Sequence, residues 1–202
     1  MTMKRLIAIY LLAVSAGYAA DVILYSTTAT SSIPAPIPQT GETNTYYARD
    51  DGAMRTNSVA WPNPRFTIQT NTNCVKDNLT GLMWARAMNQ FGNCTWTNAI
   101  SNCNAVSYGG YTDWRLPNVR EMQSLVVTVF GYNNLCNTAG TGHWTSGNPF
   151  IGSCATPWTS TRYYGYPNAD WSNAIYIDFA YGGLGTSDNL TATHSVWPCR
   201  GP

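Results

Sequence analysis

The sequence predicts an α+β fold in which two helices precede a series of short strands joined by long loops. Apolar residues recur at helical spacing over residues 96–106 and 119–129. After these two stretches, short β-prone runs alternate with segments rich in Gly, Asn and Thr. Helices grouped apart from strands are typical of α+β domains.

The composition bounds the class of protein. The chain has 202 residues, enough for one domain with a proper core. Only 10% of them are charged, whereas there are eight Trp and 13 Tyr, so neutral polar groups must cover the surface. The net charge of +1 becomes −1 once Lys4 and Arg5 are removed with the leader. Because no basic field results, nucleic acid and anionic membranes are not expected partners.

Residues 1–19 have the features of a signal peptide. Lys4 and Arg5 form its positive end, and the apolar run Leu6–Ala16 is too short for a comfortable membrane span. Small residues at Gly17 and Ala19 suit cleavage near Ala19. We expect a secreted, extracellular or cell-surface protein with no transmembrane segment after signal removal; the alternative is a retained anchor.

Residues 20–60 form a predicted N-terminal arm or linker. Val22–Tyr25 is short and β-prone, and the prolines of Pro34–Pro38 favour an extended, stiff chain. The arm is interpreted either as a tether or as a donor strand. In the second case Val22–Tyr25 would add to the sheet edge of a neighbouring copy.

The first half of the domain is predicted to contain three strands and a helix. Phe66 and Ile68 alternate inward on the first strand, and Asn78–Gly81 has turn chemistry. Thr95 is a suitable N-cap for the helix, on which Trp96, Ile100 and Cys103 share a face. The expected elements are, in order, strands at 65–70, 74–77 and 82–84 and a helix at 96–106.

A rigid corner follows at residues 109–125. Pro117 fixes its own φ, Asn118 can cap a helix, and Glu121 has capping-box spacing. A second helix is expected over 119–129, with one face formed by Met122, Leu125, Val126 and Val129. The charged residues of the corner are either a ligand site or part of the architecture, and a charge pair beside a buried Trp favours architecture. These residues are Asp113, Arg115 and Arg120.

The C-terminal third is expected to be rich in loops, with strands at 158–161, 174–179 and 194–199 and a turn at Gly182-Gly183. One loop mixes aromatic side chains with amides and a carboxylate. Sugars stack on aromatic faces and bond to planar polar groups, so this mixture suits glycan binding. The same mixture suits a protein-binding surface. The predicted ligand-binding residues are Tyr163, Tyr164, Tyr166, Asn168, Asp170, Trp171 and Asn173.

No catalytic constellation is recognisable. Hydrolase, zinc-protease and phosphate-loop motifs are missing, and His143 and His194 lack a spacing that would pair them with a nucleophile. The six cysteines show no C-x-x-C pair, and an even number in an exported chain favours disulfides over a metal site. Fifteen pairings are open from sequence alone. We therefore expect a protein that is not an enzyme and holds no metal.

Four runs carry a family resemblance: the corner at 109–125, Asp77–Trp84, Trp158–Thr161 and Ser195–Pro198. In order and spacing they resemble the Lcl C-terminal domain family, bacterial extracellular domains related to the C-type lectin fold. The resemblance covers about residues 61–202 and implies a C-type lectin-like, disulfide-stabilised domain there.

The resemblance also bears on the cysteines and on calcium. It implies that Cys103 bridges Cys199; Cys136 and Cys154 flank one loop and form a second candidate pair, which leaves Cys74 with Cys94. Tyr166-Pro167-Asn168 is similar to the Pro-Asn element of calcium-dependent lectins, but Tyr166 replaces its carboxylate. We therefore expect no cofactor, with calcium as the alternative.

Together these observations lead to two hypotheses. The first is an exported, non-enzymatic adhesion module that recognises an extracellular glycan or protein through its C-terminal loops. The alternative is a subunit of a self-assembling extracellular filament, joined to further copies of itself by the N-terminal strand.

Overall fold

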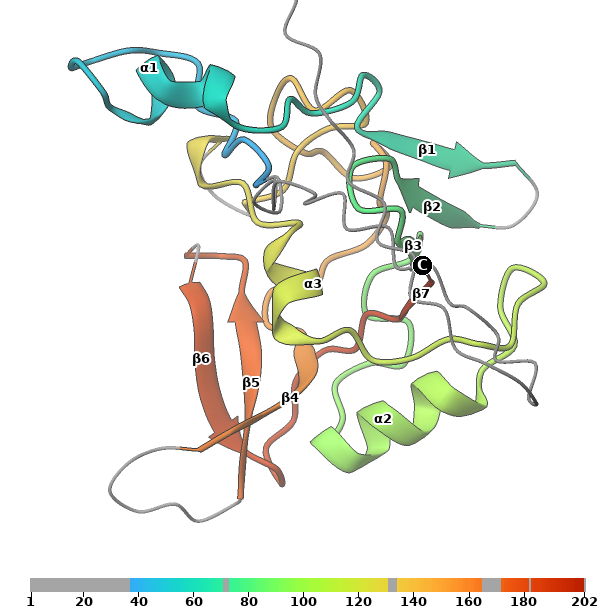
Figure 1. Ribbon diagram of the computed structural model, residues 1–202. Coiled ribbons are helices and arrows are strands. Elements are labelled where there is room, and N and C mark those ends of the chain that lie inside the picture. Colours follow the sequence, from blue (N-terminus) through green and yellow to red (C-terminus); the bar gives the residue numbers. More distant parts are fainter. Residues whose placement is uncertain (1–36, 71–72, 131–133, 165–171, 182, 202) are drawn as a thin grey trace, which may run out of the picture. The chain divides into compact units, whose positions relative to one another are not determined.

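The computed structural model describes residues 37–70, 73–130, 134–164, 172–181 and 183–201 (Figure 1). The chain divides into two compact units, Met1–Ala35 and Pro36–Pro202, and the described residues all belong to the second. Val22–Tyr25 lies outside them. None of the described helices is long and apolar enough to span a bilayer. The elements are α1 (Asp51–Met54), η1 (Arg55–Asn57), β1 (Phe66–Gln69), β2 (Cys74–Asp77), β3 (Met83–Ala85), α2 (Trp96–Ala105), α3 (Val119–Gln123), η2 (Thr128–Phe130), β4 (Trp158–Tyr163), β5 (Asn173–Asp178), β6 (Gly183–Asn189) and β7 (Cys199–Arg200).

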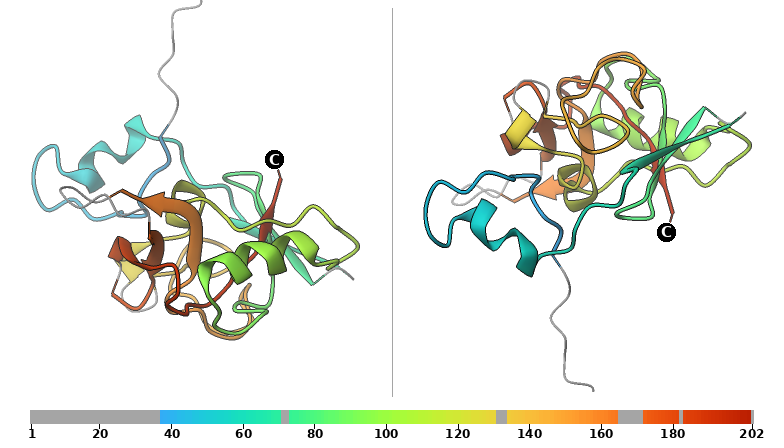
Figure 2. Two further views of the ribbon diagram at one scale, coloured as in Figure 1. Left: turned by 90° about the horizontal axis from the view of Figure 1, so that it is seen from below. Right: turned by 90° about the horizontal axis from the view of Figure 1, so that it is seen from above.

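The strands form two antiparallel sheets, in agreement with the predicted α+β class. One sheet has the order β1-β2-β3-β7 and the other the order β4-β5-β6 (Figures 1 and 2). The closing segment forms isolated backbone β-bridges to three earlier parts of the domain. His194 pairs with Cys94, Ser195 with Pro157, and Cys199 with Arg115. The last residues of the chain therefore hold together the segments that precede α2, α3 and β4.

The early elements lie close to where the sequence places them. β1, β2 and β3 fall within or next to the three predicted strands, and α2 begins after Thr95 as expected. The Thr95 side chain makes no cap bond, so the helix depends instead on burial of Ala99 and Cys103. In β1 and α2 the apolar pattern was a sufficient signal because each element buries one face, whereas β2 and β3 have buried residues on both faces.

The second helix is shorter than predicted. Its capping box is confirmed, since Asn118 accepts from the Glu121 amide and Glu121 accepts from the Asn118 amide. The prediction that it extends to Val129 is wrong: α3 ends at Gln123, and residues 128–130 form the separate 3-10 turn η2. The Val127 amide donates to the Asn134 carbonyl at 2.7 Å instead of to its own helix. A long-range bond therefore replaces the local periodic one.

Strand β6 is not among the sequence predictions. Its residues include two Gly, an Asp and an Asn, all of which are depleted in strands. It forms because β5 offers a hydrogen-bonding edge, to which it pairs from Asn173↔Asn189 to Asp178↔Gly183. Pairing with a neighbour overrides the weak intrinsic preference.

The main core is an aromatic stack between the two halves of the chain. Trp197 lies 5.4 Å from Trp84 and 4.7 Å from Phe150, and Phe150 lies 5.2 Å from Phe66 (ring centroids). All four rings are buried, and the Trp197 Nε1–H donates to the Ala85 carbonyl at 2.8 Å. Tilted and edge-on pairs of this kind add to the stabilisation from area burial.

A buried ion pair adjoins this core. Arg65 and Asp77 are both fully buried, with Nε–Oδ1 at 2.9 Å and the second nitrogen to Oδ2 at 3.0 Å. Arg65 also donates to the Ser124 carbonyl and lies over the Trp61 and Phe66 rings. The pair connects β1, β2 and the end of α3 at one point.

Part of the predicted arm is folded. The Gln39 amide donates to the Val59 carbonyl at 3.0 Å, the Val59 amide donates to the Ile37 carbonyl at 2.9 Å, and the Trp61 indole donates to the Gln39 carbonyl at 2.7 Å. Residues 39–59 thus form a closed loop, here called the tyrosine loop, which carries α1 and η1. Figure 1 shows it extending away from both sheets.

The six cysteines are free thiols in this structure, so the disulfide pairs stay predictions. Burial, together with the smaller effect of the neighbouring Cys94, raises the pKa of Cys103 to about 12. Burial also raises the pKa of Cys136 to about 11 and of Cys154 to about 12. Because a thiol must ionise to act as a nucleophile, these buried cysteines suit structural roles.

The buried pair gives a stability prediction. Asp77→Asn leaves the Arg65 charge buried without its counter-ion, which we expect to cost about 3–5 kcal/mol of unfolding free energy. Urea unfolding followed by tryptophan fluorescence measures this loss. Asp113→Asn removes the carboxylate of the exposed Asp113–Arg200 pair and is the matched control, with a much smaller expected effect. Equal losses in the two variants would contradict the importance given to the buried pair.

Candidate functional site

The predicted binding loop connects β4 to β5. Tyr163 is the last residue of β4, Tyr164 follows it, and Asn173 is the first residue of β5. Tyr163 and Tyr164 are 44% and 55% exposed, so both rings are accessible. The other four predicted residues, Tyr166, Asn168, Asp170 and Trp171, lie outside the described residues.

The sheet places Tyr163 in a row with two asparagines. Tyr163 pairs directly with Asn173, and Asn173 pairs directly with Asn189 on β6. Directly opposed residues of antiparallel strands project from the same face. One aromatic ring and two amides therefore stand side by side at the end of the sheet; we call them the Tyr–Asn row. Asn189 was missed because β6 has no strand signal in the sequence.

The side-chain amides of Asn173 and Asn189 accept hydrogen bonds through their oxygens, and their N–H donors are available to a ligand. The Asn189 side-chain oxygen accepts from the Thr191 amide and hydroxyl, and the Asn173 oxygen accepts from the Ser172 hydroxyl. Neither amide nitrogen donates to any part of the chain that the structure describes. Each carboxamide nitrogen carries two hydrogens. The row thus presents N–H donors beside an accessible aromatic ring.

The opposite face of the same strands gives the row a rigid backing. Arg162, Ala174 and Asp188 form the next row, and Ala174 is fully buried. The Arg162 guanidinium lies 5.9 Å from the Trp96 ring centre, which ties β4 to α2. Alternating faces thus separate packing from exposure along these strands.

His194 is part of this backing. Its ring stacks on Tyr176 at 4.1 Å and meets Trp158 edge-on at 4.4 Å. Its Nε2 lies 3.1 Å from the Asp188 carboxylate, and this hydrogen bond lowers the pKa of Asp188 below its usual range. The second histidine, His143, is exposed, and its backbone forms an isolated β-bridge with Cys136. The two histidines thus have different surroundings: His194 packs among aromatic rings, whereas His143 is at the surface.

The charged corner is architectural. Arg115 makes a bidentate bond to Glu121 at 2.7 and 2.6 Å and also donates to the Gly201 carbonyl. Asp113 makes a bidentate bond to Arg200 at 2.6 and 2.9 Å. Arg120 bonds to Gln123 on its own helix. Each of the three charges has its own partner, so they do not converge on one ligand, in agreement with the structural interpretation.

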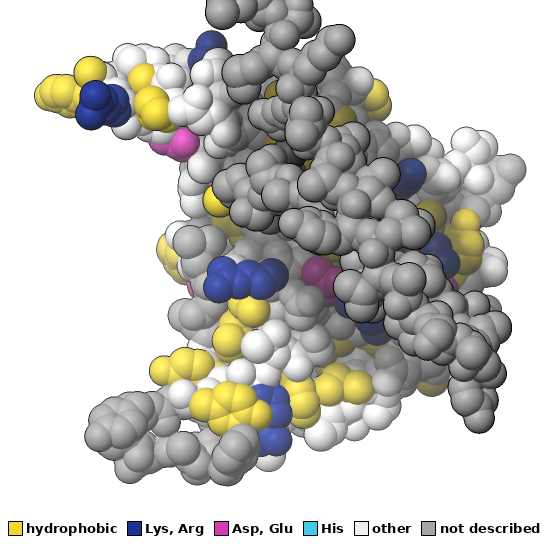
Figure 3. All heavy atoms as spheres, viewed as in Figure 1, with side chains coloured by type: hydrophobic (Ala, Val, Ile, Leu, Met, Phe, Trp, Pro, Cys, Tyr) yellow, Lys and Arg dark blue, Asp and Glu magenta, His cyan; other side chains and the backbone are white. Residues whose placement is uncertain are grey.

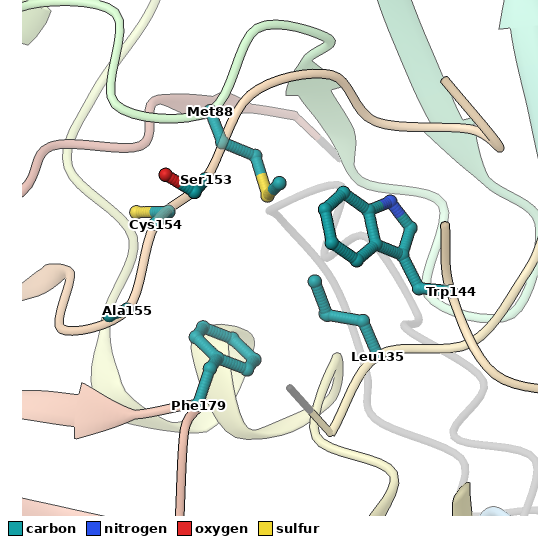
Figure 4. A pocket seen from close by; sticks show the side chains of 7 residues that line it. All are labelled: Met88, Leu135, Trp144, Ser153, Cys154, Ala155 and Phe179. Atoms are coloured by element: carbon teal, nitrogen blue, oxygen red, sulfur yellow. The ribbon is translucent and has the colours of Figure 1, made fainter. Parts of the chain in front are cut away.

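A hollow of about 170 Å³ lies inside the domain (Figure 4). Figure 4 shows the Met88, Trp144, Leu135 and Phe179 side chains around it, with the Cys154 sulfur directed away. That sulfur lies 3.1 Å from the Ser195 hydroxyl. Across the described ranges, no group of three or more His, Cys, Asp or Glu residues could hold a metal ion. The hollow therefore offers little polar chemistry.

Comparison with known proteins agrees with the runs quoted above. The model of the family described as the Lcl C-terminal domain matches residues 73–200, which is more than half of the chain. This match includes α2, α3 and all strands except β1. No curated protein matches the sequence.

The lowered pKa of Glu121 at the corner predicts that the stability of the fold depends on pH. Burial opposes ionisation of Glu121, but the bonds from Arg115 and the Asn118 amide outweigh it and lower its pKa below the ordinary 4.5. The folded state thus keeps Glu121 ionised to lower pH than the unfolded chain does. The stabilisation that the ionised Glu121 provides is fully present above its ordinary pKa of 4.5 and is lost as the pH falls through the folded pKa.

We therefore expect Glu121→Gln to lower the melting temperature at neutral pH, with the difference from wild type narrowing between about pH 5 and pH 3. Thermal unfolding followed by circular dichroism over this range measures the effect. Arg120→Gln is the control, because its partner Gln123 does not titrate. A difference that stays constant with pH would contradict the role given to the Glu121 carboxylate.

Proposed function

The chain belongs to the Lcl C-terminal domain family, and from this premise we propose that it is an exported, non-enzymatic adhesion module with a C-type lectin-like fold. We propose that the β4–β5 loop and the Tyr–Asn row bind an extracellular glycan. The signal-peptide pattern at residues 1–19 supports export. The two-sheet α+β arrangement with long loops supports the fold assignment.

The observation that carries the glycan proposal is the Tyr–Asn row. A sugar ring can stack on the Tyr163 face while its hydroxyls accept from the Asn173 and Asn189 amides, because cross-strand spacing puts these groups about 5 Å apart. Precisely placed polar groups beside an apolar surface are what orient small ligands. A protein ligand would use the same aromatic surface, and it is the competing outcome of the test below.

The proposed disulfides fit this extracellular role. Cys103 and Cys199 are both buried, and besides burial the charge of Cys103 raises the pKa of the Cys199 thiol, as expected of close neighbours. This supports the Cys103–Cys199 pair, whereas Cys94 is a second neighbour of Cys103. A disulfide in this region would contribute about 2–4 kcal/mol.

The glycan proposal is tested with a glycan array and then with titration of the best ligand. We expect Tyr163→Ala to weaken binding about tenfold or more, which corresponds to about 1.4 kcal/mol. Asn189→Ala should weaken it as well, through loss of the amide donor. Tyr181→Ala is the matched control: it is 87% exposed but lies at the β5–β6 turn, at the other end of the sheet.

Two results would count against this assignment. One is the absence of any glycan ligand for the wild-type protein. The other is equal binding by the Tyr163, Asn189 and Tyr181 variants, which would place the ligand elsewhere. Binding to a protein but to no glycan, lost on Tyr163→Ala, would keep the surface and replace the ligand class.

The filament alternative is favoured by one feature of β6. The Leu190 amide donates to the Ser172 carbonyl at 2.7 Å, and bonded pairs alternate in an antiparallel ladder. The backbone groups of Ser187 and Asn189 therefore point away from β5. Those of Asn189 bond to Asp188 and Ala192, but those of Ser187 have no partner among the described residues. An open edge of this kind can accept a strand.

If Val22–Tyr25 of a neighbouring copy occupies that edge, the mature protein forms multimers that persist on dilution. Deletion of residues 20–32 removes the donor strand and should leave monomers. Multi-angle light scattering of both proteins measures the masses. A monomeric full-length mature protein would remove the filament alternative without affecting the glycan proposal.

A further inference from the structure

The tyrosine loop, residues 39–59, is held in one conformation by its own carboxylates. Asp50 accepts from the amides of Tyr46, Tyr47 and Ala53 at 2.6, 2.9 and 2.8 Å. These bonds lower the pKa of Asp50, so it stays ionised at physiological pH. Glu42 accepts from the amides of Thr43 and Asn44 in the same way. Two acidic side chains thus accept hydrogen bonds from the backbone amides of this loop.

A glycine locks the loop further. Gly52 of α1 packs against the Asn44 carbonyl, and a Cβ at this position would lie 1.9 Å from that oxygen. No larger residue fits without moving the backbone. Arg55 crosses the loop and donates to the Thr43 carbonyl at 2.5 Å. With its base closed by Gln39, Val59 and Trp61, the loop is a preorganised unit.

What this unit presents to solvent is aromatic. Tyr46 and Tyr47 are 74% and 81% exposed, and Met54 and Arg49 are exposed near them. Hydrophobic and basic side chains gather at this tip in the space-filling view (Figure 3). Tyr, Met and Arg are the residues enriched at protein interfaces, and a fixed backbone reduces the entropy lost on binding. The tip therefore has the character of an interface anchor.

The same chain carries a hollow that could receive such an anchor. It lies beside α3, is open to solvent, and measures about 300 Å³. Leu82 contributes an apolar wall, and Arg120 is exposed at the site, where its guanidinium can meet an aromatic ring. The volume is at the low end for ligand pockets, which run from about 300 to 1,000 Å³, and suits a single ring. The lining residues are Thr80, Leu82, Asn118, Arg120, Glu121 and Ser124.

We propose that the tyrosine loop inserts Tyr46 or Tyr47 into the hollow beside α3 of another copy of this chain. None of the loop residues lines the hollow, so the two surfaces are distinct and the contact is head-to-tail. The occupant is a second copy because the part of the arm that carries the donor strand enters this loop at its base, where the Ile37 carbonyl accepts from the Val59 amide. If that strand pairs with a neighbouring copy, as in the filament alternative, the same neighbour is held near the loop.

This inference rests on the filament alternative and adds a second contact to it. Because each copy has one loop and one hollow, the contact repeats without closing unless the rotation between copies forms a ring. The arm would provide main-chain pairing, and the loop would set the orientation of successive copies. Two linked contacts also strengthen association beyond either alone.

The test is a complementation experiment with the full mature chain. One variant lacks the anchor (Tyr46→Ala with Tyr47→Ala), and the other has the hollow filled (Thr80→Trp, at a half-buried wall residue). Each alone should associate at least tenfold more weakly than wild type in sedimentation velocity. Mixed at equal concentration, they should associate more tightly than either variant alone, since the anchor of one copy can enter the hollow of the other while pairing through the arm is unchanged.

Control variants are Tyr181→Ala and Thr112→Trp, both at exposed positions outside the loop and the hollow, and they should assemble as wild type. Circular dichroism and thermal unfolding establish that all variants are folded. Undiminished assembly of either test variant, or a mixture that associates no more tightly than either variant alone, would overturn the loop-and-hollow contact alone. A monomeric wild-type protein would overturn the filament alternative together with this inference.

Discussion

The buried ion pair between Arg65 and Asp77 is the interaction on which most of the domain depends. Taking both charges out of water is costly, and only a complete set of partners can offset that cost. Here the carboxylate meets the guanidinium twice and also accepts from the Leu79 amide, while Arg65 also bonds to the Ser124 carbonyl. One pair thereby fixes the β1–β2 register, the turn into β3 and the end of α3.

The pair also positions the base of the tyrosine loop. The Arg65 guanidinium lies 4.8 Å from the Trp61 ring centre, and the Trp61 indole bonds to Gln39 at the loop's base. Gly140 passes close by, where a Cβ would lie 2.9 Å from the Arg65 Cβ and where φ is +81°. This position requires glycine for both reasons. A single buried contact thus connects the sheet, α3 and the base of the tyrosine loop.

The few charges of this chain mostly serve architecture. Arg115 with Glu121, Arg200 with Asp113, and the Asp50 carboxylate with three backbone amides all fix corners or loops. Tyrosine and amide side chains remain at least partly exposed at the Tyr–Asn row and at the tyrosine loop, the two surfaces that we propose for recognition. Both surfaces stand on rigid backing, which is what a binding surface needs to limit its entropy cost. A glycan-binding end and a self-associating loop would together suit an adhesive surface layer or fibre.

The sequence by itself determined the elements whose signals are local. The strands near Phe66, Val75 and Trp84, the start of α2 and the Asn118–Glu121 capping box all follow from short-range patterns and are present. It also grouped Tyr163, Tyr164 and Asn173 in one aromatic and polar stretch; the two tyrosines are exposed, but Tyr163 ends β4 and Asn173 begins β5 instead of lying in the loop. Tertiary structure alone decided that α3 ends at Gln123, that residues 183–189 form a strand, and that Asn189 stands beside Asn173. It likewise chose the partner of each corner charge. These outcomes depend on groups distant in sequence, such as the Asn134 carbonyl that takes the Val127 amide, and the free energy of such contacts exceeds the local preferences that a sequence displays.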